Sequence, residues 1–272
     1  MQDPSKPIWI NKTTTVNSKP KKFSVFVATP VHSEVSIHYA QACLEFQKHC
    51  MKNNVMVMFQ LMKSSLVTQG RNLCVSSFME SNLSHLLFID SDIDFQSESI
   101  FKMIEADKDV ISIPYPLKDI NWDKGMHMIN EGKIKEAKDL RNKAFYRYPF
   151  KVENNNEIRI QNGVIEVTHS PTGFMLIKRE VFTKMIKAYP HLRIDQDQVI
   201  NGKNVRLEHM WNFFDTEFNP EKHTYLGEDF AFCKRWKDIG GKCHAWIMDY
   251  ITHVGEHQYT GRFADELILP DK

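Results

Sequence analysis

The stretch LLFIDSDIDF, residues 86–95, runs four apolar residues directly into a series of carboxylates. The apolar run ends at Asp90, and acids recur at Asp92 and Asp94. Like charges at this spacing repel one another and resist burial unless a cation lies among them. The stretch therefore predicts a buried strand whose carboxyl end carries a charged site.

The segments on either side of this stretch alternate between strand and helix patterns. Runs of β-branched and aromatic residues predict strands, and apolar residues three or four apart predict helices. In chain order, the pattern gives a strand at 22–30, a helix at 33–53, a strand at 55–62, a helix at 68–82, the strand at 85–90, a helix at 97–107 and a strand at 109–115. This order predicts an α/β fold in which helices cover both faces of a parallel sheet.

The first predicted helix follows a strand that ends at a proline. Ser33 is a candidate N-cap for this helix. The apolar residues Ile37, Ala40, Leu44 and Phe46 recur at helical spacing, so we expect them to face the core.

Composition bounds the size of the core and excludes some partners. The chain has 272 residues, of which 42% are apolar and 25% charged, which suits one domain with a sizeable core. Its formal charge is +1, from 35 basic and 34 acidic residues, so no overall field favours nucleic acid or an anionic membrane. Neither partner class is expected.

The five cysteines form no CxxC pair, and their odd number argues against a full disulfide framework. Reduced thiols indicate a cytoplasmic setting, which would be the host cytoplasm if the source is a virus. Residues 1–21 lack the apolar run of a signal peptide or membrane anchor, so we expect a flexible polar arm and no membrane span.

The carboxylates of the opening stretch are candidates for holding a divalent cation. Ligands of open α/β sheets bind beyond the carboxyl ends of the strands, where these acids are expected. Oxygen ligands suit Mg²⁺ or Mn²⁺, whereas zinc favours Cys or His neighbours. As an alternative, acids after a strand cap the next helix, a role that Asp94 and Ser97 would fill.

FIDSDIDF resembles the DxD signature of nucleotide-sugar-dependent glycosyltransferases of the GT-A fold. Five further blocks occur in the family's order, namely VFVATPVH, QGRNLCVSSFM, SPTGFMLIKREVF, YLGEDFAFCKRWKDIGG and ITHVG. The resemblance implies one GT-A domain over residues 22–272, a Rossmann-like α/β/α sandwich with a mixed, mainly parallel central sheet. A composition rich in Lys, Asn and Ile suggests a bacterial, phage or large-virus source.

The resemblance also implies the cation ligands. Asp92 would bind Mn²⁺ or Mg²⁺ directly, and Asp90 would lie toward the ribose or beside the metal. His253, in ITHVG, would be a further ligand, with His257 as the reserve candidate. Because DSDID contains two overlapping DxD frames, Asp94 remains an alternative ligand.

GEDFAFCKRW, residues 227–236, resembles the ED motif that begins a helix under the acceptor site. The resemblance implies that Asp229, with Glu228 beside it, removes a proton from the acceptor hydroxyl in an inverting reaction. We expect the helix dipole to keep these carboxylates charged, as a base requires. The alternative is that the acids only cap the helix.

The resemblance implies a donor-binding set around the same sheet edge. Glycine in PTGFMLI would let the backbone approach the donor sugar. The residues of this set are Thr29, Pro30, Arg71, Asn72, Asp90, Ser91 and Gly173. A solvated arginine, a helix-surface asparagine and a turn glycine are the alternatives for Arg71, Asn72 and Gly173.

Residues 117–165 are expected to form an inserted, lid-like segment that contains an exposed helix of mixed charge at 131–143. Tyr115, Lys118 and Trp122, at its start, would line a sugar pocket, because aromatic faces pack against the C–H surface of sugars. They would equally serve as hinge packing for a lid.

The function implied by the resemblance is metal-dependent hexosyl transfer from a nucleotide sugar, with a UDP-sugar favoured, to a hydroxyl of a glycan, a protein or a small molecule. One alternative is a retaining transferase of the same fold, and another is a non-catalytic protein that binds sugar or nucleotide. A nucleotidyltransferase is disfavoured because VATPVHSE lacks the glycines of a phosphate loop.

Overall fold

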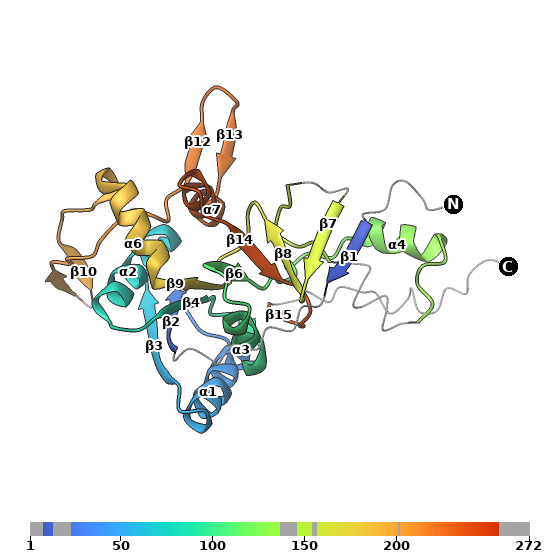
Figure 1. Ribbon diagram of the computed structural model, residues 1–272, viewed down its shortest axis with the longest axis horizontal. Coiled ribbons are helices and arrows are strands. Elements are labelled where there is room, and N and C mark those ends of the chain that lie inside the picture. The colour runs from blue at the N-terminus through green and yellow to red at the C-terminus, as the bar shows by residue number, and fades with distance from the viewer. Residues whose placement is uncertain (1–7, 13–22, 137–145, 154–156, 201, 256–272) are drawn as a thin grey trace, which may run out of the picture.

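The structure is a computed structural model that describes residues 8–12, 23–136, 146–153, 157–200 and 202–255. A nine-stranded sheet forms its centre, in the order β1-β7-β8-β14-β6-β9-β4-β2-β3 (Figure 1). Its strands are β1 (Ile8–Lys12), β2 (Ser24–Val31), β3 (Met56–Lys63), β4 (His85–Ile89), β6 (Val110–Ser112), β7 (Glu157–Gln161), β8 (Val164–Val167), β9 (Phe174–Lys178) and β14 (Cys243–Trp246).

Helices and three small two-stranded sheets surround this centre. The helices are α1 (Ile37–Lys52), α2 (Val67–Glu80), α3 (Ser97–Glu105), α4 (Trp122–Asn130), α6 (Arg179–Ala188), the 3₁₀ turn η2 (Pro190–Leu192) and α7 (Glu228–Asp238). The small sheets pair β5 (Ile93–Asp94) with β15 (Thr252–His253), β10 (Gln198–Ile200) with β11 (Lys203–Val205), and β12 (Glu217–Asn219) with β13 (Thr224–Leu226). Among the described residues, no helix is both long enough and apolar enough to cross a bilayer.

The central sheet is mixed and mainly parallel. Strand β2 runs parallel to β3 and β4, whereas β9 is antiparallel to both of its neighbours, β4 and β6. Beyond β6, β14 is parallel to it, β8 is antiparallel to β14 and β7, and β1 is parallel to β7. Seven of the nine strands therefore point one way and two, β8 and β9, point the other.

Helices lie on both faces of the sheet, as predicted. Side chains along β2 alternate between two cores: Val25 and Val27 pack with α1 and α3, and Phe26 and Ala28 pack with α2, α6 and α7. Figure 1 shows the same division, with α1 and α3 on one side of β2 and β4 and with α2 and α6 on the other. The result is a three-layer α/β/α arrangement.

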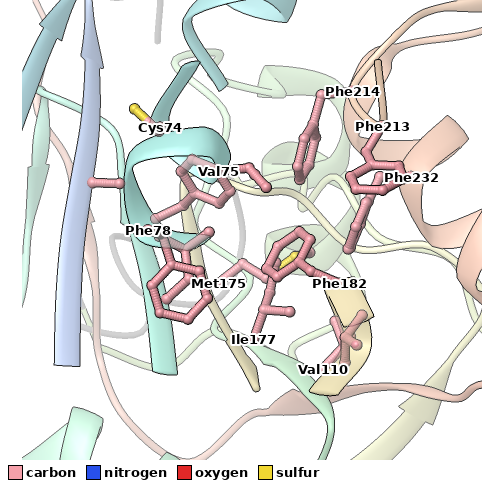
Figure 2. Packing of buried hydrophobic residues seen from close by; sticks show 14 of the residues in the cluster. Cys74, Val75, Phe78, Val110, Met175, Ile177, Phe182, Phe213, Phe214 and Phe232 are labelled. Carbon is pink, nitrogen blue, oxygen red and sulfur yellow. The ribbon is translucent and has the colours of Figure 1, made fainter. Parts of the chain in front are cut away.

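Aromatic side chains fill the core under α7. Phe214 stacks on Phe232 of α7 with ring centroids 4.4 Å apart, and its ring also packs edge-on against Phe88 of β4, at 5.2 Å. Figure 2 shows Phe182 and Phe213 beside this stack, with α2 and β9 supplying the aliphatic neighbours. This packing fixes the N-terminus of α7 close to the end of β4.

Two predictions about the first helix were wrong. Its N-cap is Ser36, whose side chain accepts a hydrogen bond from the His38 amide, and Ser33 lies outside the helix. Ile37 is 78% exposed and Leu44 66% exposed, although Phe46 is buried as expected. The buried face of α1 is instead made by Tyr39, Ala42, Phe46 and Cys50.

The arm and the insert also differ from expectation. Within the predicted arm, β1 pairs in parallel with β7 at the edge of the central sheet. Helix α4 forms at residues 122–130, earlier than the helix predicted at 131–143. Residues 131–136 form a turn and irregular chain, and the rest of that predicted helix falls among residues 137–145, outside the described residues.

Candidate functional site

The carboxyl ends of β2 and β4 meet at a point where the order of the strands reverses. From β2 the chain crosses to β3 on one side, and it then returns to β4 on the other side. Ligands of open α/β sheets bind in the crevice outside such a switch point. Asp90 directly follows β4, so the carboxylates of the opening stretch lie where a crevice of this kind is expected.

A short antiparallel pairing brings the C-terminal histidine to these acids. Residues Ile93 and His253 are partners in the β5–β15 ladder, and the Val254 amide donates to the Asp92 carbonyl at 2.8 Å. As a result, His253 Nε2 lies 3.3 Å from Asp92 Oδ2. Two residues 161 positions apart thus meet at the end of β4.

The contact between His253 and Asp92 has the chemistry of a cation site. His253 Nδ1 lies 3.0 Å from the Pro116 carbonyl, which can only accept, so Nδ1 carries the proton. In the neutral ring Nε2 then presents a lone pair to the Asp92 carboxylate. Two acceptors at this separation require a proton or a cation near both of them, and an outer partner that orients a histidine in this way is typical of metal-ligating histidines.

Lys118 forms an ion pair with the same Asp92 carboxylate. Lys118 Nζ lies 2.5 Å from Asp92 Oδ2, the oxygen that faces His253. Burial alone would raise the pKa of Asp92, but the hydrogen bonds and positive charges of His253, when its ring is protonated, and of Lys118 lower it to about 2. The carboxylate is therefore ionised at any physiological pH, as a ligand must be.

Asp90 belongs to a different ion pair. Arg71 Nη2 donates to Asp90 Oδ1 at 3.0 Å, and Arg71 Nε donates to Glu228 Oε1 at 3.3 Å. Across the described part of the chain, no cluster of three or more His, Cys, Asp or Glu side chains is arranged to hold a metal ion. Asp92 is paired with His253, and Asp90 is paired with Arg71.

Arg71 lies beneath the crevice as a buried bridge between two acids. Its side chain is 4% exposed, and its guanidinium lies over the Phe88 ring at 5.3 Å. Burial opposes its charge, but Asp90 and Glu228 outweigh burial and raise the pKa of Arg71. Its Nη1 has no hydrogen-bond partner among the described residues.

Asp229 is the titratable acid of the group. Burial and the charge of Glu228 raise the pKa of Asp229 to about 6, and the Phe230 amide, which donates to Oδ1 at 2.7 Å, and Arg71 only partly oppose them. The pKa of Asp229 is thus raised although the residue lies at a helix N-terminus. A carboxylate with this pKa is mostly ionised at neutral pH and is a stronger base than an ordinary aspartate.

The backbone at Gly173 packs closely against Asp90 and Tyr115. Its carbonyl accepts from the Asp90 amide at 2.9 Å, and a Cβ at this position would lie 2.6 Å from both Asp90 Oδ2 and the Tyr115 hydroxyl. Only glycine leaves these two side chains in place. Tyr115 in turn packs edge-on against the His253 ring at 4.9 Å, and its role in lining a sugar pocket stays a prediction.

Two predicted donor-binding residues turn their side chains away. The Thr29 hydroxyl is buried against Tyr39 at 2.6 Å. Asn72 is also buried, where its Oδ1 accepts from the Phe214 amide at 2.9 Å and its Nδ2 donates to Asn212 Oδ1 at 2.9 Å. The structure gives both side chains a packing role, and neither reaches the crevice.

The other predicted residues fall at the rim or elsewhere. Pro30 packs near Gly70, and the Ser91 carbonyl accepts from the Ser36 amide at 2.8 Å. Asp94 lines a separate cleft of about 520 Å³ between α1 and α3, so the first DxD frame is the one at the crevice. Trp122 begins α4 and is 61% exposed, and His257 lies outside the described residues.

The pairing of Lys118 with Asp92 was missed by sequence reasoning, which placed Lys118 in a sugar pocket. The signal was available in principle: Lys118 follows β6, which points the same way as β4, so their carboxyl ends share one edge. The Pro116 carbonyl that orients His253 had no sequence signal at all.

No family model matches the chain, and no curated protein matches it. Forty-six chains of solved structures match, among them the crystal structure of A197 from STIV. That chain aligns with a TM-score of 0.42 and 15% identity over 88% of this chain and 98% of its own length. Likeness at this level assigns neither a fold family nor an activity.

Proposed function

We propose that this chain is a metal-dependent glycosyltransferase of the GT-A type that uses a nucleotide-sugar donor. The observation that carries the proposal is the meeting of Asp92 and His253 at the switch point of the sheet. The sequence resemblance to DxD enzymes named the same two residues as ligands. A resemblance and an independent contact therefore support one site.

The residues at hand fit a hard divalent cation. An ionised carboxylate and an imidazole whose proton is fixed on the far nitrogen offer one oxygen and one nitrogen ligand. Asp92 and His253 would hold the cation, and the diphosphate of the donor would complete its ligands. When bound, Mn²⁺ or Mg²⁺ supplies Lewis-acid stabilisation of the charge that develops on the leaving diphosphate.

The chain's own residues would position the donor and remove the proton. Asp90 and Glu228, held by Arg71, would form the floor of the donor site, and Gly173 leaves room there for the Asp90 and Tyr115 side chains. Asp229 is the proposed base for the acceptor hydroxyl, because its raised pKa gives it basicity at neutral pH. A single base of this kind favours inversion at the anomeric carbon.

Calorimetry of UDP binding tests the metal role. In Mn²⁺, we expect Asp92→Ala to weaken UDP binding by more than about tenfold, because it removes the proposed oxygen ligand. The matched control is Asp94→Ala, two residues along the same stretch but facing the α1–α3 cleft, which should bind UDP like the wild type. Equal wild-type affinity for UDP in Mn²⁺ and in excess EDTA would refute the proposal.

A further inference from the structure

We propose that Lys118 is an internal competitor for the cation at Asp92, so that cation and nucleoside diphosphate bind cooperatively with Lys118 as the coupling residue. The inference rests on the proposed function and concerns the same site. It adds a residue that the DxD resemblance does not include. It also makes the affinity for the cation depend on whether the nucleoside diphosphate is bound.

The competition follows from a shared oxygen. Lys118 Nζ and His253 Nε2 both approach Asp92 Oδ2, at 2.5 and 3.3 Å. A cation held between the carboxylate and the imidazole would lie next to this ammonium, and like charges this close repel one another. The ammonium and the metal ion therefore exclude each other at Asp92.

Lys118 is held in place by packing as well as by charge. Its stem crosses Gly255, where a Cβ would lie 2.6 Å from Lys118 Cδ and 3.1 Å from Cε. Lys118 also follows closely on Pro116, whose carbonyl orients His253. One short loop thus prepares the histidine as a ligand and at the same time neutralises its partner acid.

A bound diphosphate would remove the competition between Lys118 and the cation for Asp92. Its several oxygens accept both a divalent cation and an ammonium group, so Lys118 can leave Asp92 for the phosphate when the donor arrives. Side chains of Lys118 and Asp92 are 41% and 35% exposed, which leaves the ammonium room to move. Without the diphosphate, a metal ion must displace Lys118 with no compensating contact.

The test measures Mn²⁺ affinity by the electron paramagnetic resonance signal of free Mn²⁺, with and without UDP. We expect Lys118→Met to bind Mn²⁺ about tenfold tighter than the wild type when UDP is absent, and the gain in Mn²⁺ affinity on adding UDP to shrink by a similar factor. The matched control is Lys102→Met, which removes another half-exposed lysine bound to an aspartate, Asp249, and should leave Mn²⁺ affinity unchanged.

A second variant separates competition from net charge. Gly255→Ala keeps every charge but pushes the Lys118 stem aside, so it should also tighten Mn²⁺ binding without UDP. If Lys118→Met and Gly255→Ala both bind Mn²⁺ like the wild type while UDP still enhances binding, competition is refuted and the proposed function stands. If no variant binds Mn²⁺ even with UDP, the cation site itself is refuted, and the proposed function falls with it.

Discussion

At the scale of single residues, the environment of Asp229 and its proposed role favour opposite protonation states. It is buried beside Glu228, which penalises its charge, yet the proposed role as a base requires the charged form. A pKa of about 6 is the outcome, and it ties activity and stability to the same proton.

Replacing Asp229 with Asn keeps the shape of the side chain but removes proton acceptance. If Asp229 is the base, transfer should fall by roughly 10² to 10⁴ while donor affinity stays unchanged. Steady-state transfer at saturating donor, with UDP calorimetry alongside, measures both quantities. The control is Asp238→Asn, at the other end of α7. Wild-type transfer by the Asn variant would remove Asp229 from the mechanism, and a collapse of donor affinity would place it on the donor sugar.

The same proton predicts two pH dependences. Wild-type transfer should rise as the pH passes about 6, because the base becomes ionised. The folded pKa lies above the ordinary value of 3.8, so the protonated acid stabilises the fold fully below pH 4, and this contribution is lost as the pH rises through 6. Relative to the wild type, Asp229→Asn should therefore gain on the order of 1–3 kcal/mol in unfolding free energy between pH 4 and pH 8, as urea titrations at the two pH values would measure.

At the scale of elements, α1 offers a direct comparison of two serines. Ser36→Ala removes the side-chain oxygen that accepts from the His38 amide, so it should cost about 1 kcal/mol in unfolding free energy. Ser33→Ala lies outside the helix and should cost only a few tenths. Thermal denaturation of the two variants ranks them, and a larger loss for Ser33→Ala would return the N-cap to that residue.

Four strands of the central sheet, β2, β3, β4 and β6, could be predicted because their apolar runs end sharply, as residues 86–89 do at Asp90. The buried face of α1 could not, because its sequence carries two apolar stripes at helical spacing. One contains Ile37 and Leu44, and the other contains Tyr39 and Phe46. Only the position of the sheet, which is set by distant residues, decides between them.

Part of the candidate site could likewise be predicted from the sequence, and part could not. Asp92 and Asp229 have local signals, because one closely follows a buried strand and the other lies in the first turn of a helix. The β5–β15 pairing has two residues on each side, which is too short for any periodic pattern to predict. The ion pairs of Arg71 with Asp90 and Glu228 could not be predicted, because whether a helix arginine faces solvent or two carboxylates depends on how α2 and α7 pack.

At the scale of the whole molecule, buried polar contacts tie the first half of the chain to the second. Arg71 joins Asp90 to Glu228, and Asn72 binds the chain at Asn212 and Phe214. These neighbours on α2 link segments that are 140 to 157 residues apart. The crevice is therefore part of what holds the two halves together.

Arg71→Met should test this link. It leaves Asp90 and Glu228 without their shared cation in a largely buried place, so we expect a loss of about 3–5 kcal/mol in unfolding free energy, measured by urea denaturation. The control is Arg206→Met, whose ion pairs with Asp195 and Asp197 are exposed and should be worth about 0–1 kcal/mol. Equal losses for the two arginines would mean that the buried bridge carries no special share of the stability.

The order of synthesis adds a consequence of the β5–β15 pairing. At roughly 5–20 residues per second, the ribosome needs about 8–32 s to travel the 161 residues (253 − 92) from Asp92 to His253. Lys118 is only 26 residues beyond Asp92, so it is made within about 1–5 s. The nascent chain therefore contains the Lys118 ammonium group, which can pair with Asp92, well before it contains His253. Lys118 thus gives Asp92 a cationic partner at a stage when His253 has not yet been made.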